Sequence, residues 1–138
     1  MGCGDRKTDQ MLSSIDTLMN NHPDSALQIL DSLKSEQPHW SKSQRMRYDL
    51  LHLKAENKAD VLLNSDSIAK QLVNYYERWG SANEKILAYY LLGRCYSDMG
   101  DSPRAIDAYQ KAVSQADITA KDCDFHTLSR VYSQMAGV

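Results

Sequence analysis

Residues 86–119 read ILAYYLLGRCYSDMGDSPRAIDAYQKAVSQADIT and carry the strongest structural signal in the chain. In the first half, apolar residues recur at steps of three and four, the period of one face of an α-helix. In the middle, MGDSP at residues 99–103 combines a glycine that can end a helix, an aspartate that can cap the next, and a proline suited to a first helical turn. The second half returns to the helical period. The stretch therefore predicts two helices joined by a tight turn.

The residue types of this helix pair resemble those of the tetratricopeptide repeat. The large and small positions of the repeat are filled, in register, by Tyr89, Leu92, Gly93, Tyr96, Ala105, Tyr109 and Ala112. Small residues let two helices approach and large ones fill the remaining space, so Gly93 is expected to face the second helix with Tyr109 in the gap. One departure is Asp117, where the family favours proline. The second helix is therefore expected to continue past Ala116.

Helical patterns also fill the rest of the chain. Apolar stripes predict helices within residues 11–19, 23–33, 41–55 and 66–79. A last helix is expected from about Lys121 to the final residue, through Phe125, Leu128, Val131, Tyr132 and Met135. Gly80 is expected to end its helix in a left-handed conformation. The sequence thus predicts an all-α fold of about seven helices over residues 9–138, and the resemblance implies a right-handed superhelix of antiparallel helix hairpins.

A second, less regular pair is predicted in the middle of the chain. The same roles are filled there by Tyr48, Leu51, Ala55, Ala69, Val73 and Tyr76. The alanines at 26, 69 and 105 are separated by 43 and then 36 residues, so we expect hairpins with turns of different lengths rather than a uniform array.

Composition limits the function classes. The chain has 138 residues, 42% of them apolar and 25% charged, and 18 acidic against 16 basic residues give a net charge of −2. This length can bury a core that needs no metal or disulfide. A near-neutral charge without a long basic run argues against nucleic-acid binding by this segment. No apolar run approaches the roughly 20 residues that cross a bilayer.

Motifs for catalysis or metal binding do not occur in the sequence. There is no glycine-rich nucleotide loop, HExxH, GxSxG or paired zinc-ligand spacing. The cysteines, Cys3, Cys95 and Cys123, are far apart, which argues against a CxxC site or a disulfide framework, and Cys95 is expected to be a small buried apolar residue. We expect a non-enzymatic protein with no cofactor and no metal.

The resemblance implies a scaffold that binds a protein or peptide, of unknown identity. In that family the first helix of each pair lines a concave groove. The matching positions here are Leu87, Tyr90, Arg94, Ser97 and Asp98 and, on the middle pair, Asp49, Leu53, Glu56 and Asn57. Arg94 suits a carboxylate, and Tyr90, expected to be partly exposed, offers an apolar face with a polar tip. The alternative is that these positions are only solvated.

The N-terminal residues 1–8 are predicted to be a flexible tether that places Cys3 where a lipid can be attached. In one interpretation Cys3 is the first mature residue of a bacterial lipoprotein, with Met1 and Gly2 standing in place of a signal peptide. Myristoylation of Gly2 is a weaker alternative because that signal needs Ser or Thr where Arg6 stands. The remaining alternative is that Cys3 is an incidental cysteine without a functional role. We expect an envelope protein, lipid-anchored and facing the periplasm or cell exterior, with a cytoplasmic location as the alternative.

The C-terminal residues suggest a longer protein. Met135 and Ala136 resemble Leu92 and Gly93, which would make the last helix the first half of another pair. We therefore expect the N-terminal repeat region of a bacterial envelope lipoprotein. The alternative is the extracytoplasmic sensor or interaction region of a longer membrane-bound transcriptional regulator or signalling protein.

Overall fold

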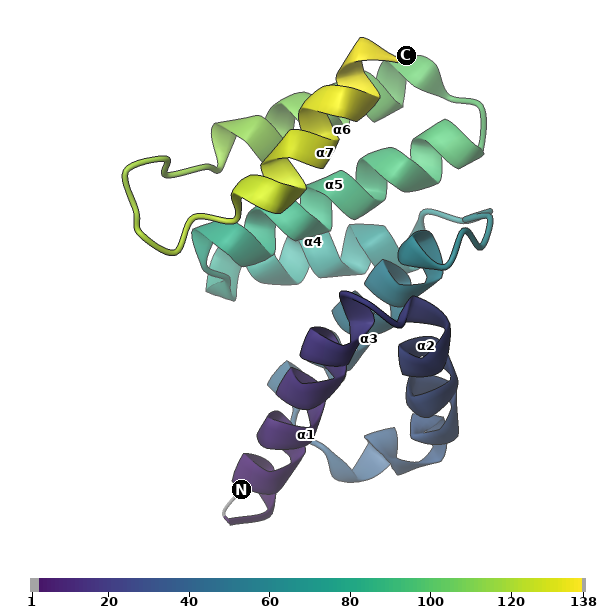
Figure 1. Ribbon diagram of the computed structural model, residues 1–138, viewed down its shortest axis with the longest axis vertical. Helices are drawn as coiled ribbons and strands as arrows, with labels where there is room; N and C mark the ends of the chain where they lie inside the picture. The colour runs from purple at the N-terminus through teal and green to yellow at the C-terminus, as the bar shows by residue number, and fades with distance from the viewer. Residues whose placement is uncertain (1–2, 138) are drawn as a thin grey trace. The chain divides into compact units, whose positions relative to one another are not determined.

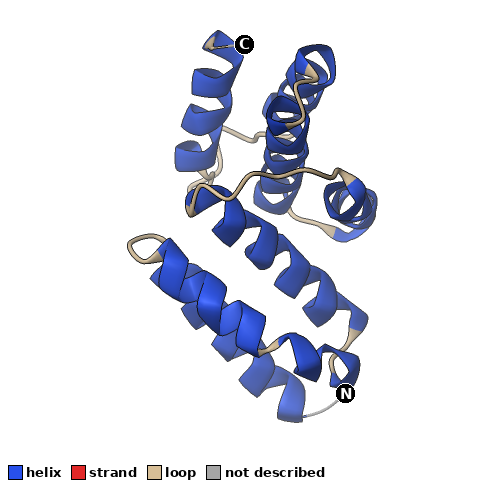
Figure 2. Ribbon diagram, turned by 90° about the vertical axis from the view of Figure 1, so that its right-hand side faces the viewer, coloured by secondary structure: helices blue, strands red, loops and turns tan. Residues whose placement is uncertain are grey.

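The computed structural model describes residues 3–137, with side chains from Arg6 onward. In this part of the chain every regular element is a helix, and Figure 2 shows helices and loops without a strand. The elements are α1 (Cys3–Met19), α2 (Pro23–Ser32), the 3-10 helix η1 (Lys34–His39), α3 (Lys42–Lys58), α4 (Ser67–Trp79), α5 (Ala82–Asp98), α6 (Ser102–Ser114) and α7 (Phe125–Ala136). The predicted all-α fold is confirmed. Among these described helices, none combines the length and the hydrophobicity needed to cross a bilayer.

The helices divide the chain into two compact units, Met1–Leu62 and Leu63–Val138. The first unit contains α1, α2, η1 and α3, and the second contains α4 to α7 (Figure 1). The sequence predicted one repeat domain, so this division is a finding of the structure.

The first unit is a bundle in which α1 packs against α2 and α3, and α2 packs against α3. Pro23 begins α2 as expected, since a proline in the first turn has no N–H to leave unpaired. Ser41 and Gln44 form a reciprocal capping box at the start of α3. An apolar cluster fills the bundle, made of Leu12, Ile15, Met19, Ala26, Leu30, Trp40, Tyr48, Leu51 and Ala55.

Polar contacts also hold α3 within this bundle. The Lys54 Nζ donates to the Asp16 Oδ1 of α1 at 2.8 Å. The Tyr48 hydroxyl donates to the backbone carbonyl of Leu30 on α2. Burial raises the pKa of Tyr48 to about 12, and the nearby Asp31 carboxylate adds to the shift. The phenol therefore stays protonated and remains a donor at neutral pH.

The predicted pairing of α3 with α4 is wrong. Tyr48, Leu51 and Ala55, the residues expected to meet α4, all belong to the cluster formed with α1 and α2. Helix α4 packs instead against α5 in the second unit. The sequence match was one of residue type and spacing, and an apolar stripe of that kind can pack against any helix with a complementary face.

In the second unit, α5 packs against α4, α6 and α7, and α6 also packs against α7 (Figure 1). The predicted α5–α6 hairpin is confirmed, with its turn chemistry in place. Gly100 has a φ of 81°, which costs a residue without a β-carbon little. The Asp101 side chain accepts a hydrogen bond from the Arg104 backbone N–H at 3.2 Å, and Pro103 lies in the first turn of α6.

Gly80 ends α4 for a different reason from the predicted one. Its φ is −93° and its ψ is 159°, an extended conformation, so the prediction of a left-handed residue is wrong. A β-carbon at this position would lie 2.7 Å from the carbonyl oxygen of Tyr76. Glycine is therefore required by the close approach of the chain to the last turn of α4.

Helix α6 ends at Ser114, so the predicted extension past Ala116 is wrong. The Asp117 Oδ1 accepts hydrogen bonds from the backbone N–H and the hydroxyl of Thr119, at 3.1 and 2.6 Å. Local bonds of this kind offer the backbone an alternative to the helix. A loop over residues 115–124 follows.

Helix α7 begins at Phe125 rather than near Lys121. The Asp124 side chain caps it by accepting hydrogen bonds from the backbone N–H and the hydroxyl of Thr127, at 3.0 and 2.6 Å. An acidic residue at this end also interacts favourably with the helix dipole.

Helix α1 begins at Cys3 and so includes most of the segment 1–8 that was expected to be a tether. No proline or glycine interrupts residues 5–19, and Arg6 and Lys7 have good helix propensity. Residues 1 and 2 and the side chain of Cys3 lie outside the described residues, so the tether and its lipid stay predictions.

His52 on α3 lies between two carboxylates of the first unit. Its Nε2 is 2.7 Å from the Asp31 Oδ1 of α2, and its Nδ1 is 3.3 Å from the Glu56 Oε1 one turn along α3. The hydrogen bond to Glu56 raises the pKa of His52, burial opposes this, and the bond to Asp31 raises the pKa further. The net shift is upward.

We predict that replacing His52 destabilises the protein in acid more than in base. Since the folded pKa lies above the unfolded one, the stabilisation is fully present below the unfolded value of about 6.5 and is lost as the pH rises through the folded pKa. His52→Gln should lower the free energy of unfolding by up to about 1 kcal/mol near pH 5.5 and much less near pH 8.5, measured by urea denaturation. The exposed His39, changed to Gln, is the control. An equal loss at both pH values would contradict the prediction.

Candidate functional site

The α5–α6 hairpin is built around a contact between a glycine and a tyrosine ring. Tyr109 on α6 is fully buried. A β-carbon on Gly93 would lie 2.3 Å from Cε1 and 2.5 Å from Cδ1 of that ring. No side chain fits at position 93 unless the ring moves. The predicted approach of the two helices at Gly93 is confirmed.

The groove residues predicted on α5 are already engaged within the second unit. Leu87, Arg94, Ser97 and Asp98 are half-buried. The Ser97 Oγ lies 2.9 Å from the Tyr109 hydroxyl oxygen, within hydrogen-bond distance. Ser97 therefore contributes to the packing of the α5–α6 hairpin.

Arg94 links α5 to the element that follows the hairpin. Its Nη1 donates to the Gln134 Oε1 of α7 at 2.9 Å, and its Nη2 donates to the Asp98 Oδ1 at 3.0 Å. The second oxygen of Asp98 accepts a hydrogen bond from the backbone N–H of Leu63 at 2.9 Å. Burial opposes the charge of Arg94, but its interactions with the Tyr109 hydroxyl and with Asp98 outweigh this and raise its pKa. The guanidinium thus stays charged as it connects these segments.

Tyr90 is covered, and the expectation that it is partly exposed is wrong. Its exposed fraction is 3%. The Arg130 Nε of α7 donates to its hydroxyl at 3.4 Å, and its ring centroid lies 6.2 Å from that of Tyr109. Helix α7, which packs on both α5 and α6, supplies the cover.

The groove residues predicted on α3 lie in the first unit. Leu53 is buried, and Asp49, Glu56 and Asn57 are half-buried. Asp49 accepts a hydrogen bond from the Gln37 Nε2 of η1 at 3.4 Å, and burial raises its pKa in spite of that bond. The two predicted sets lie in different units, so a groove formed by both stays a prediction.

Chemistry-bearing side chains do not gather into a metal site in the part of the chain that the structure describes. No group of three or more His, Cys, Asp or Glu residues there is placed to hold an ion. Cys95 is fully buried, as expected of a small apolar residue, and Cys123 is half-buried with a free thiol.

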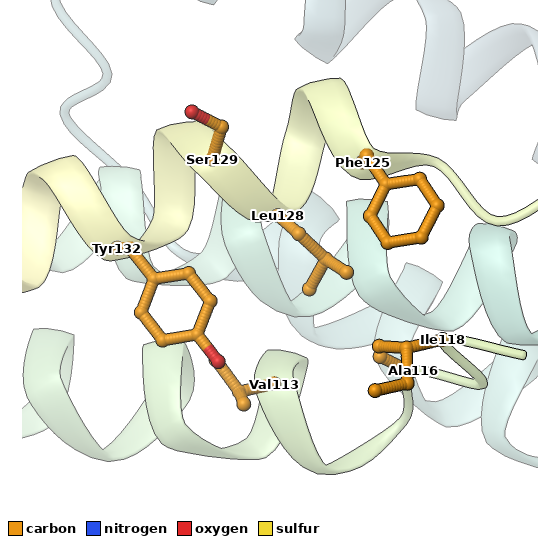
Figure 3. A pocket seen from close by; sticks show the side chains of 7 residues that line it. All are labelled: Val113, Ala116, Ile118, Phe125, Leu128, Ser129 and Tyr132. Carbon is orange, nitrogen blue, oxygen red and sulfur yellow. The ribbon is translucent and has the colours of Figure 1, made fainter.

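An apolar pocket of about 540 Å³ opens between the end of α6, the loop of residues 115–124 and α7. It is lined by Val113, Ala116, Ile118, Phe125, Leu128 and Tyr132, with Ser129 at its edge. Figure 3 shows Phe125, Leu128 and Tyr132 projecting from α7 on the side of α6 and the loop, while Ser129 points away. Ile118, Phe125 and Tyr132 are 70%, 54% and 56% exposed. Large apolar side chains gathered in this way mark a candidate interaction surface.

The loop beside the pocket is acidic. It carries Asp117, Asp122 and Asp124 against a single basic residue, Lys121. The pKa of Cys123 in the same loop is raised, first by burial and then by the charges of these three aspartates. All three carboxylates therefore disfavour the negatively charged form of the Cys123 thiol.

The pocket did not follow from the sequence. Phe125 and Tyr132 were expected in a helix stripe typical of a core, and of the α7 residues that line the pocket only Leu128 is buried. One usable signal was Ile118, an isoleucine between the turn-forming residues Asp117 and Thr119, where an apolar side chain has no helix face to pack on.

Comparison with known families bears on the hairpin. Residues 86–116 match the model of the tetratricopeptide repeat. The hairpin is therefore similar to this repeat. The matched residues contain both Gly93 and Tyr109, and the match supports the predicted family. Comparison with curated proteins and with solved structures found no match.

We predict that Gly93→Ala destabilises the second unit. The added β-carbon clashes with the buried Tyr109 ring, and overpacking of this kind typically costs about 1–3 kcal/mol of the free energy of unfolding. Urea denaturation followed by circular dichroism measures the loss. Gly137→Ala is a matched control, because a β-carbon there meets nothing closer than 3.7 Å and the φ is not positive. Equal stability of the two variants would show that the repeat tolerates a side chain at position 93.

Proposed function

We propose that this chain is a non-enzymatic scaffold that binds a protein or a peptide. The observation that carries the proposal is the match of residues 86–116 to the tetratricopeptide repeat, since such repeats typically bind protein partners. The tight packing of Gly93 against Tyr109 supports it, because the hairpin keeps the packing that its residue types predict. The exposed apolar residues of the second unit offer surface for a partner.

Some of the groove residues that the family resemblance implies are also proposed to contact the partner. Leu87, Arg94 and Ser97 keep some exposed surface, so we propose them as secondary contacts. Tyr90 is not retained, because it is buried beneath α7.

Capture and crosslinking test the scaffold. The immobilised chain is incubated with an envelope extract from cells that carry the native gene, and retained proteins are crosslinked and identified by mass spectrometry. We expect at least one protein to be enriched about tenfold over a Gly93→Arg control, whose hairpin cannot pack because an arginine has no room against Tyr109. If the two chains retain the same proteins in the same amounts, the scaffold function is wrong.

We further propose that a lipid on Cys3 holds this scaffold at a bacterial envelope membrane, on the periplasmic or exterior side. The support is in the sequence, where a cysteine is followed by the short hydrophilic run Asp5, Arg6 and Lys7 before the first apolar stripe. A single acyl chain gives only marginal membrane binding, so two chains, on the sulfur and on the amino group, are needed for a stable anchor.

Metabolic labelling tests the tether. Cells expressing the native gene are fed an alkyne-tagged palmitate, and the tagged peptides are identified by mass spectrometry. We expect label on the peptide that contains Cys3, a loss of nearly all label in Cys3→Ser, and no change in the control Cys123→Ser. Absence of label from the unaltered protein would refute the tether and would leave the scaffold proposal standing.

A further inference from the structure

Helix α1 begins at Cys3, so no unstructured spacer separates this residue from the first unit. A helix rises about 1.5 Å per residue, which places Arg6 and Lys7 about 4.5 and 6 Å from Cys3 along the axis. Charges interact over about 8 Å at physiological ionic strength. A lipid on Cys3 would therefore bring both basic residues within reach of the membrane headgroups.

Helix α3 begins at the same end of the first unit as α1 (Figure 1). The Gln44 Nε2 of α3 donates to the Asp9 Oδ1 of α1 at 3.2 Å, and further along both helices Lys54 donates to Asp16. Because the two bonds advance in the same direction, the helices run parallel. Gln44 is 3% exposed, so a buried side chain holds this end together, and Lys42 is exposed beside it.

This end of the first unit carries more basic than acidic residues. We call its basic residues, Arg6, Lys7, Lys42 and Arg45, the basic end. The acidic residues of the same turns are Asp5 and Asp9, while Lys34 and Glu36 of η1 balance each other. Asp9 and Arg45 bond to neutral groups, the Gln44 amide and the Trp40 carbonyl, so these bonds leave their charges in place. The positive dipole ends of α1 and α3 add to the surplus.

The overall charge of −2 conceals this surplus, because acidic residues lie at the opposite end of the first unit. Helix α1 ends there and α2 begins, with Asp24 in its first turn. Helix α3 ends there too, followed by Asp60. The fold therefore separates charges that the sequence mixes.

Helix termini, rather than a helix face, form the basic end. In a repeat stack each repeat contacts only its neighbours, and those contacts use the faces of the helices. Further repeats therefore leave this end accessible. Acylation of the Cys3 amino group, as proposed above, makes this residue the first of the anchored protein.

We propose that the basic end binds anionic phospholipid headgroups, so that the first unit stands directly on the membrane at which Cys3 is anchored. The inference rests on the proposed lipid on Cys3 and adds to it a protein surface and the class of lipid that this surface selects. A lysine or arginine near an anionic surface strengthens binding roughly fivefold.

A chain with a synthetic anchor tests the proposal. The full chain with Cys123→Ser is coupled through Cys3 to a maleimide that carries one myristoyl-length chain, since Cys95 is fully buried. One such chain binds membranes only marginally, so the contribution of the protein can be measured. The vesicles contain phosphatidylcholine alone or with a third of it replaced by phosphatidylglycerol. We expect co-sedimentation to show at least about tenfold stronger binding to the anionic vesicles.

Charge variants locate the contact. Lys7→Gln with Lys42→Gln should reduce the preference for anionic vesicles to less than about threefold. Both side chains are exposed, so the fold should be unaffected, which circular dichroism checks. Lys58→Gln with Lys121→Gln is the matched control, because it removes the same charge from the far end of α3 and from the second unit. This control should keep the preference.

Inorganic phosphate separates a membrane surface from a site for one anion. Added at constant ionic strength, it should leave the preference unchanged, because a single anion does not displace a surface of many headgroups. Loss of the preference would mean that the basic end holds one phosphate, and the proposal would be wrong.

Two further results would overturn the membrane contact. They are equal binding to both kinds of vesicle, and a preference that survives the change of Lys7 and Lys42. The tether fails in a different way. If cells attach no lipid to Cys3, the tether is wrong, whereas the vesicles still report on the basic end because their anchor is added chemically.

Discussion

The contact between Gly93 and the Tyr109 ring is the constraint on which the second unit depends. Because Gly93 has no β-carbon, α5 and α6 approach closely enough to enclose the Tyr109 ring completely. The hydroxyl of that ring then lies beside Ser97 and Arg94. Arg94 carries the connection on to Gln134 of α7 and to the carboxylate that holds the loop before α4. A continuous set of contacts thus connects the buried ring with α5, α7 and the loop before α4.

Local signals made the hairpin predictable. Gly100, Asp101 and Pro103 act within a few residues of themselves, so their effect on the turn can be read without knowing what else packs nearby. The same is true of the all-α fold, which follows from the period of the apolar residues. Asp117 shows the limit of such reading, because a missing proline predicted a longer helix while the aspartate itself ended it through its bonds to Thr119.

Features that depend on distant neighbours did not follow from the sequence. Tyr90 was expected at the surface because its place in the pattern says nothing of α7, whose Arg130 is 40 residues away. Tyr48 fitted a repeat-like pair equally well with α4 or with the bundle of α1 and α2, and only packing chooses between them. The apolar pocket was missed for the same reason, since Phe125 and Tyr132 look like core residues until their exposure is known.

Ten residues, 115–124, separate α6 from α7, whereas a tight turn joins α5 to α6. Helix α7 is attached by side-chain bonds such as those of Arg130 and Gln134, and by Asn83 of α5, which bonds to both the Asp122 carbonyl and the Asp124 N–H. The side chains of Leu128 and Val131 are buried as well, so an opening of α7 must also expose apolar surface. An opening of α7 would break the bond from Arg130 to the Tyr90 hydroxyl, so the burial of Tyr90 depends on the attachment of α7.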